Sequence, residues 1–177
     1  MEAKEWKEKL LTNKKNGYDL MPAEEREAMD RYCQGYKAFL DAGKTERECV
    51  QEGIRLAEEK GFRPYVRGME LKSGDKVYLD NRGKMLMLAV IGQKSLAEGA
   101  QITAAHIDSP RMDLKPAPLY EDSELAYLKT HYYGGIRKYQ WVTIPLELHG
   151  VLALKDGSTV QVAIGNNPGD PVFTVDD

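Results

Sequence analysis

His106 and Asp108, two residues apart, form the pair of side chains in this sequence with the clearest capacity for chemistry. They lie in residues 101–108, which we predict to be a strand that stops at Ser109 and Pro110. Alternate residues of a strand share a face, so we expect the imidazole and the carboxylate to project together. Sites form at the ends of strands in α/β sheets. A carboxylate there can fix the tautomer of a histidine and raise its basicity as a metal ligand.

The His-x-Asp spacing also fits a histidine that is simply hydrogen-bonded near a turn. The spacing by itself does not distinguish this alternative from a metal ligand. Two further histidines are present. His131 borders the turn at residues 132–135, and His149 falls on the strand face opposite Leu146 and Leu148. We therefore expect His131 and His149 to face solvent or an interface and not to bind metal.

Helices are predicted to occupy the first sixty residues. Apolar residues at helical spacing mark a short helix within the first ten residues. A second helix follows Pro22, which suits the first helical position, and ends at Gly43. A third opens with the capping box of Thr45 and Glu48 and ends at Gly61.

Strands replace helices after residue 61. Residues 76–80 alternate in polarity, residues 81–83 have turn chemistry, and residues 85–91 form an apolar run typical of a strand buried on both faces. A short helical stretch at 95–98 then leads into the strand at 101–108. This alternation of helices and strands predicts an α/β fold.

Only strand-like segments follow residue 118, at residues 124–131, 140–149, 151–154 and 159–164. Asp156-Gly157 is a strong hairpin signal between the last two. We therefore divide the chain into an α/β part, residues 1–117, and the start of a β-rich module, residues 118–177. About sixty residues are marginal as an independent domain, and unpaired strand edges favour pairing with other chains. We expect self-association through this module.

Composition narrows the classes of function. The 177 residues are 42% hydrophobic and 30% charged, with a net charge of −3, which is ordinary for a folded globular protein. The sequence contains no basic block of the kind that would indicate nucleic-acid binding. No apolar run approaches the ~20 residues of a membrane-spanning helix. The charged N-terminus lacks the apolar core of a secretory signal, which favours a cytoplasmic location. Cys33 and Cys49 have no CxxC partner, so we expect buried reduced thiols in preference to a disulfide or a zinc site.

The segment Ala105-His106-Ile107-Asp108-Ser109-Pro110-Arg111-Met112-Asp113-Leu114-Lys115-Pro116 resembles the first metal-ligand motif of the M18 family of zinc aminopeptidases, the aspartyl aminopeptidase group. Similar matches are Tyr133-Gly134-Gly135-Ile136, Lys138-Tyr139-Gln140-Trp141, Pro145-Leu146-Glu147-Leu148-His149-Gly150 and Phe173-Thr174-Val175-Asp176-Asp177. The resemblance implies an α/β/α zinc-exopeptidase catalytic domain, interrupted after the first ligand by a β-rich module used in oligomer assembly. It also implies two metal ions, usually zinc, and removal of single residues from peptide N-termini.

Carried over to this sequence, the resemblance makes His106 a metal ligand and Asp108 a site residue that orients His106. The bridging aspartate, the general base and the other ligands of the family would lie beyond Asp177. We therefore expect an N-terminal fragment, inactive by itself. The alternative is a non-catalytic binding or assembly module that keeps half a metal site. One histidine and one aspartate do not discriminate among zinc, manganese and cobalt.

Overall fold

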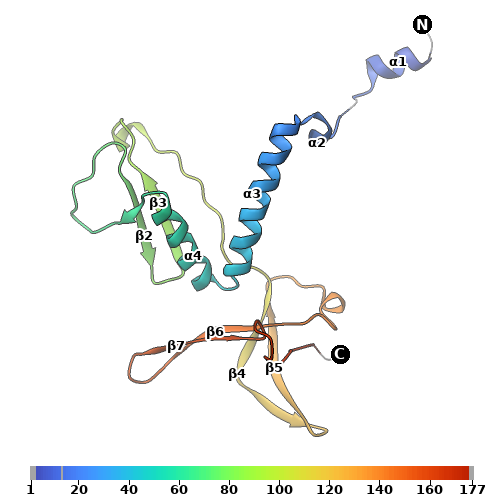
Figure 1. The fold of residues 1–177 in the computed structure, drawn as a ribbon, viewed down its shortest axis with the longest axis vertical. Helices are drawn as coiled ribbons and strands as arrows, with labels where there is room; N and C mark the ends of the chain where they lie inside the picture. The colour runs from blue at the N-terminus through green and yellow to red at the C-terminus, as the bar shows by residue number, and fades with distance from the viewer. Residues whose placement is uncertain (1–2, 13, 176–177) are drawn as a thin grey trace. The chain divides into compact units, whose positions relative to one another are not determined.

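The computed structural model describes residues 3–12 and 14–175, and its contacts divide the chain into two compact units, residues 1–41 and 42–177. The first unit is helical (Figure 1) and contains α1 (Ala3–Leu10), α2 (Gly17–Leu20) and α3 (Ala23–Ala42). The predicted helices α1 and α3 are confirmed, and α2 is an additional turn that begins after Asn16. Cys33 on α3 is exposed, so the expected buried thiol is wrong at this position.

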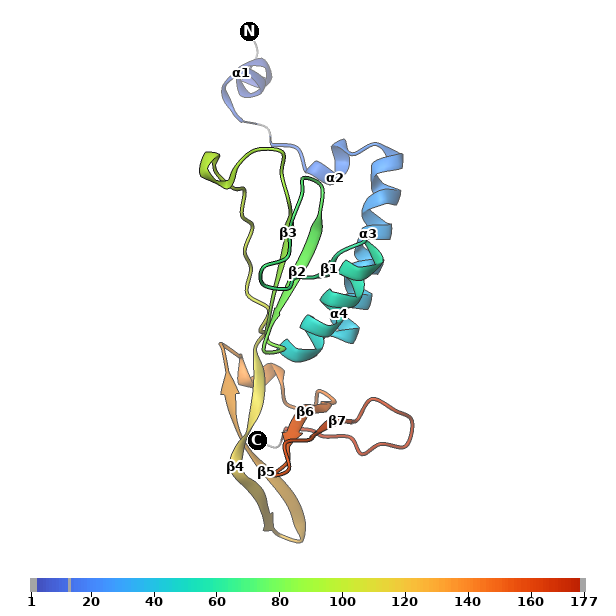
Figure 2. The same cartoon turned by 90° about the vertical axis from the view of Figure 1, so that its left-hand side faces the viewer.

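The second unit begins with a helix packed on a small sheet. The helix is α4 (Glu46–Glu59), and the sheet has the order β1 (Arg63–Pro64), β2 (Lys76–Asn81), β3 (Met85–Val90). Strands β1 and β2 are parallel, and β2 and β3 form the predicted antiparallel hairpin. Figure 2 shows α4 lying against this sheet, in agreement with the contacts between α4 and both β2 and β3.

The capping box at the start of α4 forms as predicted. The Thr45 hydroxyl accepts a hydrogen bond from the backbone N–H of Glu48 at 3.3 Å, and the Glu48 carboxylate accepts one from the backbone N–H of Thr45 at 2.8 Å. Gly53 then lets α4 approach β3, since a Cβ at this position would lie 2.8 Å from Leu86 Cδ2. The buried core between helix and sheet comprises Cys49, Val50, Ala57, Val77 and Tyr78.

The burial expected for residues 85–91 and the strand expected at residues 101–108 are both wrong, for the same physical reason. Residues 85–91 were expected to be buried on both faces, yet Met87, Leu88 and Val90 are exposed. Residues 101–108 were expected to form a strand, but no ladder includes them. A strand needs partners for its backbone groups and layers for its faces. Among the described residues, α4 is the helix packed against β2 and β3, and no segment pairs with residues 101–108.

After the 3₁₀ turn η1 (Leu96–Glu98), two separate antiparallel hairpins make up most of the remaining chain (Figure 1). The first consists of β4 (Arg111–Asp122) and β5 (Leu125–Tyr133), and the second of β6 (Leu148–Ala153) and β7 (Thr159–Ile164). Gly157 has φ +86° in the β6–β7 turn, as expected for an Asp-Gly hairpin. The mixed α/β class is confirmed.

The sequence did not reveal β4, because Pro116 and Pro118 lie within it. Proline donates no ladder hydrogen bond and is tolerated at irregularities, and the register indeed shifts between Leu114 and Leu119. Residue 118, where we divide the chain into two modules, thus lies inside a strand, and that division stays a prediction.

The strand predicted for residues 140–149 is wrong over most of its length. The 3₁₀ turn η2 (Lys138–Gln140) precedes it, and Thr143 has a φ of +70°, which interrupts an extended run. Only isolated bridges join Val142 to Val175 and Leu146 to Phe173 before β6 begins. None of the described helices is both long and apolar enough to cross a membrane.

Candidate metal-binding site

His106 lies in the irregular segment between η1 and β4, and its ring is held from one side only. Its Nδ1 is 2.8 Å from the backbone oxygen of Asp108 and 3.3 Å from the Asp108 carboxylate. A carbonyl oxygen can only accept, so Nδ1 carries the proton and donates. The Nε2 lone pair is then available on a side chain that is 83% exposed. Although no strand forms here, the structure brings the predicted pair together.

Asp108 is held from its other side by Tyr133, the last residue of β5. The Tyr133 hydroxyl donates to Asp108 Oδ2 at 2.8 Å. This hydrogen bond lowers the pKa of Asp108, with a further contribution from His106, and raises the pKa of Tyr133. The carboxylate therefore stays ionised and can accept hydrogen bonds on both sides.

The β4–β5 ladder places Arg111 directly opposite Tyr133. The Arg111 guanidinium lies 4.1 Å from the centroid of the Tyr133 ring, in a cation–π contact. Asp113, two residues along the same strand face, accepts from Arg111 Nε at 2.8 Å. Glu46, in the first turn of α4, lies 3.0 Å from an Arg111 terminal nitrogen. Burial lowers the pKa of Arg111, but these acidic partners outweigh burial and raise it.

A glycine follows β5 where the chain passes close to Pro110. Gly134 has a φ of +75°, and a Cβ there would lie 3.4 Å from Cα of Pro110. The chain therefore passes close to Pro110, next to Asp108, only with a residue that tolerates this backbone conformation. We missed Tyr133 as a site residue at the sequence level, although it begins one of the matching motifs and could have been found there.

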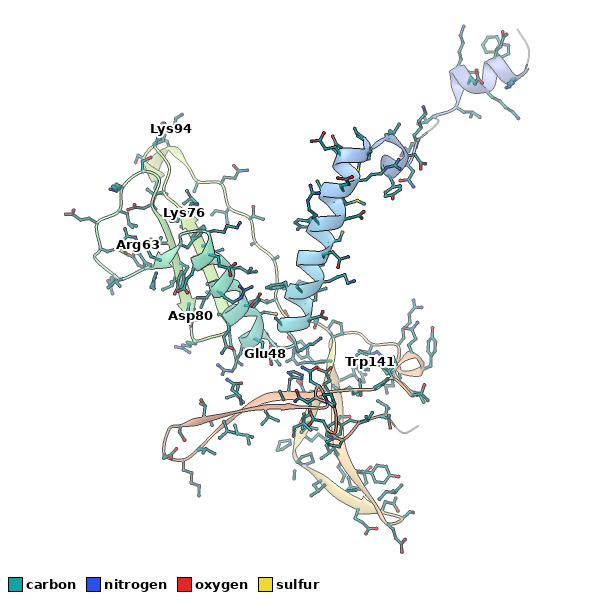
Figure 3. The ribbon with its side chains drawn as sticks, in the orientation of Figure 1. Glu48, Arg63, Lys76, Asp80, Lys94 and Trp141 are labelled. Carbon is teal, nitrogen blue, oxygen red and sulfur yellow. The ribbon has the colours of Figure 1, made fainter. Side chains whose placement is uncertain are left out.

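His149, which we expected to face solvent or an interface, does not face solvent. Its side chain is only 11% exposed, and its two ring nitrogens each lie 2.9 Å from a carboxylate, Glu48 for Nδ1 and Glu147 for Nε2. Glu48 is labelled near the beginning of α4 in Figure 3. Each ring nitrogen therefore faces a carboxylate oxygen, an arrangement that favours the protonated ring, in which both nitrogens donate.

The charge of this cluster follows from its contacts. Burial lowers the pKa of His149, but the hydrogen bonds to Glu48 and Glu147 outweigh burial and raise it. Burial raises the pKa of Glu48, whereas hydrogen bonds from His149 and Thr45 lower it overall. His131, on β5, is exposed as predicted.

The His106–Asp108 pair has no further candidate metal ligand beside it within the described residues. No three His, Cys, Asp or Glu side chains gather there in a way that could hold an ion. A groove between β4 and the segment leading into β6 is lined by both apolar and polar side chains, among them Arg111, Glu147 and His149, but neither His106 nor Asp108 borders it.

Fold and site thus define a mixed α/β chain with a histidine–carboxylate pair in which Nε2 of the histidine is exposed. The family model described as "Aminopeptidase I zinc metalloprotease (M18)" matches residues 39–177. A protein of Clostridium acetobutylicum named "Probable M18 family aminopeptidase 1" is 50% identical over 172 residues, which cover 95% of this chain and 37% of that protein. The chain belongs to the M18 peptidase family.

Solved structures agree with this assignment. The crystal structure of aminopeptidase I from Borrelia burgdorferi has a TM-score of 0.86 and 39% identity, covering 92% of this chain and 40% of that one. The crystal structure of aminopeptidase I from Clostridium acetobutylicum has a TM-score of 0.78 and 49% identity, covering 95% of this chain and 38% of that one. The chain therefore spans well under half the length of these relatives.

Proposed function

We propose that this chain is part of a zinc-dependent aminopeptidase that removes N-terminal residues from peptides, with His106 as a metal ligand through Nε2. The observation that carries the proposal is the orientation of the ring. Nδ1 donates to Asp108, so the exposed Nε2 is the free acceptor. Membership of the M18 family supports both the metal and the reaction class.

The donor chemistry fits zinc. A neutral imidazole is among the preferred ligands of Zn²⁺, and a hydrogen bond from its second nitrogen to a carboxylate or carbonyl is its usual support. Bound zinc supplies a Lewis acid and lowers the pKa of coordinated water to near neutrality. In this chain His106 would bind the ion, and Asp108 would hold the Nδ1 proton and the ring orientation. The other ligands, a second ion and the general base would come from outside the described residues, and manganese or cobalt could replace zinc.

The test uses the protein at the full length of its relatives. We expect His106→Ala to abolish hydrolysis of aminoacyl substrates, and Asp108→Asn to lower it by about 10- to 100-fold. His131→Ala is the matched control, since His131 is an exposed histidine on β5, and it should leave the rate unchanged. A His106→Ala protein with the wild-type rate would contradict the assignment.

We further propose that residues 118–177 begin a β-rich module, inserted after residues 1–117 of the catalytic domain, through which copies of the protein associate. Supporting this, the hairpins expose large apolar side chains, among them Leu119, Leu125, Leu152 and Val160. Leu152 and Val160 are cross-strand partners in the β6–β7 ladder, and adjoining exposed apolar side chains are typical of interaction sites. Sedimentation of the full-length protein tests the proposal: an assembly unchanged by deletion of this module would contradict it.

A further inference from the structure

We propose that Tyr133 is a positioning residue for the metal-ligating pair: it holds the Asp108 carboxylate in the orientation that fixes His106. This inference rests on the proposed function, in which His106 binds zinc. It adds Tyr133 to His106 and Asp108 as a third residue of the site, 25 residues after Asp108 in the chain.

The two oxygens of Asp108 have different partners. Oδ1 faces Nδ1 of His106 at 3.3 Å, and Oδ2 accepts the Tyr133 hydroxyl at 2.8 Å. The Asp108 side chain is about one-third exposed, so water competes for both oxygens. A carboxylate held at one oxygen only would turn more freely about its last torsion, which is broad. The Tyr133 hydrogen bond selects the rotation that keeps Oδ1 toward His106.

Tyr133 is itself held in place by the β4–β5 hairpin. The ladder fixes its backbone opposite Arg111, and the Arg111 guanidinium covers its ring at 4.1 Å. Arg111 in turn is restrained by Asp113 on its own strand and by Glu46 at the start of α4. A hydroxyl on a ring fixed in this way is a pre-organised donor, and such support restricts the geometry of a metal ligand.

The contact between Tyr133 and Asp108 serves to position a side chain and not to pack the core. The Tyr133 side chain remains partly exposed and contributes nothing to the buried core. Gly134, which follows Tyr133, turns the chain close to Pro110 with a φ of +75°, a conformation that glycine adopts without strain. The Tyr133 hydroxyl makes its hydrogen bond to Asp108.

The experiment measures the zinc dissociation constant of the full-length protein by competition with a chromogenic chelator. Tyr133→Phe removes the hydroxyl but keeps the ring over Arg111, and we expect it to raise the dissociation constant about tenfold. Tyr132→Phe is the matched control: it is the same change on the adjacent tyrosine, which is exposed and whose ring contacts the Lys138 ammonium. It should bind zinc as the wild type does.

A double variant separates positioning from general structure. If Tyr133 acts through Asp108, Tyr133→Phe should have no further effect in an Asp108→Asn background, and circular dichroism should show equal folding of all variants. Two results would overturn the inference and leave the proposed function intact. One is a wild-type zinc affinity for Tyr133→Phe. The other is a double variant in which the effects of Tyr133→Phe and Asp108→Asn on zinc affinity add in full. If Asp108→Asn and His106→Ala both bind zinc normally, the proposed function fails, and this inference with it.

Discussion

His149 forms an ionic bridge between two segments 101 residues apart, and removing it should destabilise the second unit measurably. His149→Ala deletes two charge-assisted hydrogen bonds and leaves the carboxylates of Glu48 and Glu147 without their shared cation. A hydrogen bond to a charged group contributes about 1.5–3 kcal/mol when buried. Because the two carboxylates are 24% and 33% exposed, solvent screens them, and we expect a total loss of about 2 kcal/mol in the free energy of unfolding.

The effect has a defined pH dependence. The pKa of His149 is raised in the folded state, so its contribution is fully present below the unfolded value of about 6.5 and is lost as the pH rises through the folded pKa. The pKa of Glu48 is lowered, so its contribution is present above the unfolded value and is lost as the pH falls through the folded pKa. The bridge should therefore stabilise the fold most in weakly acidic solution.

Urea unfolding at about pH 5.5 and about pH 8.5, followed by circular dichroism, measures this contribution. The wild type should lose more stability between the two pH values than His149→Ala does, and His131→Ala should behave as the wild type. Glu48→Gln keeps the capping box, which accepts glutamine, but removes the charge, so NMR should show a lower pKa for His149. A His149→Ala loss below about 0.5 kcal/mol, or a pH dependence equal to that of the wild type, would show that the bridge does not stabilise the fold.

Three further predictions concern the cap, the turn and the isolated chain. Thr45→Ala should cost about 1 kcal/mol of unfolding free energy, because the Glu48 N–H loses its acceptor; an unchanged urea midpoint would contradict this. Gly134→Ala should be destabilising by about 1 kcal/mol or more, since φ is +75° and Pro110 is close; equal stability to a Gly135→Ala control, which meets no atom within 4 Å, would contradict it. The 177-residue chain alone should bind zinc weakly and hydrolyse no aminoacyl substrate; stoichiometric zinc retained through dialysis would show this to be wrong.

The sequence predicts those elements whose hydrogen bonds join residues close together in the chain. The Thr45–Glu48 capping box predicts the start of α4, and Asp156-Gly157 predicts the β6–β7 turn, because each signal satisfies its own backbone groups within a few residues. Pro116 and Pro118 concealed β4, since only the register of the partner strand shows that the ladder resumes beyond them.

Only the contact between residues close in the sequence could be predicted at the candidate site. His106 and Asp108 are two residues apart, so their meeting follows from short-range geometry even without the expected strand. Tyr133 reaches Asp108 through the pairing of β4 with β5, and His149 reaches Glu48 across 101 residues. Contacts of this kind depend on the register and placement of whole elements, which residue types and spacing do not determine.

Anomalous diffraction at the zinc edge from crystals of the full-length protein would show directly whether His106 binds a metal through Nε2. We expect an anomalous peak about 2.0–2.1 Å from His106 Nε2, with Nδ1 still donating to Asp108. A zinc peak bound elsewhere, or one bound to Nδ1 of His106, would contradict it.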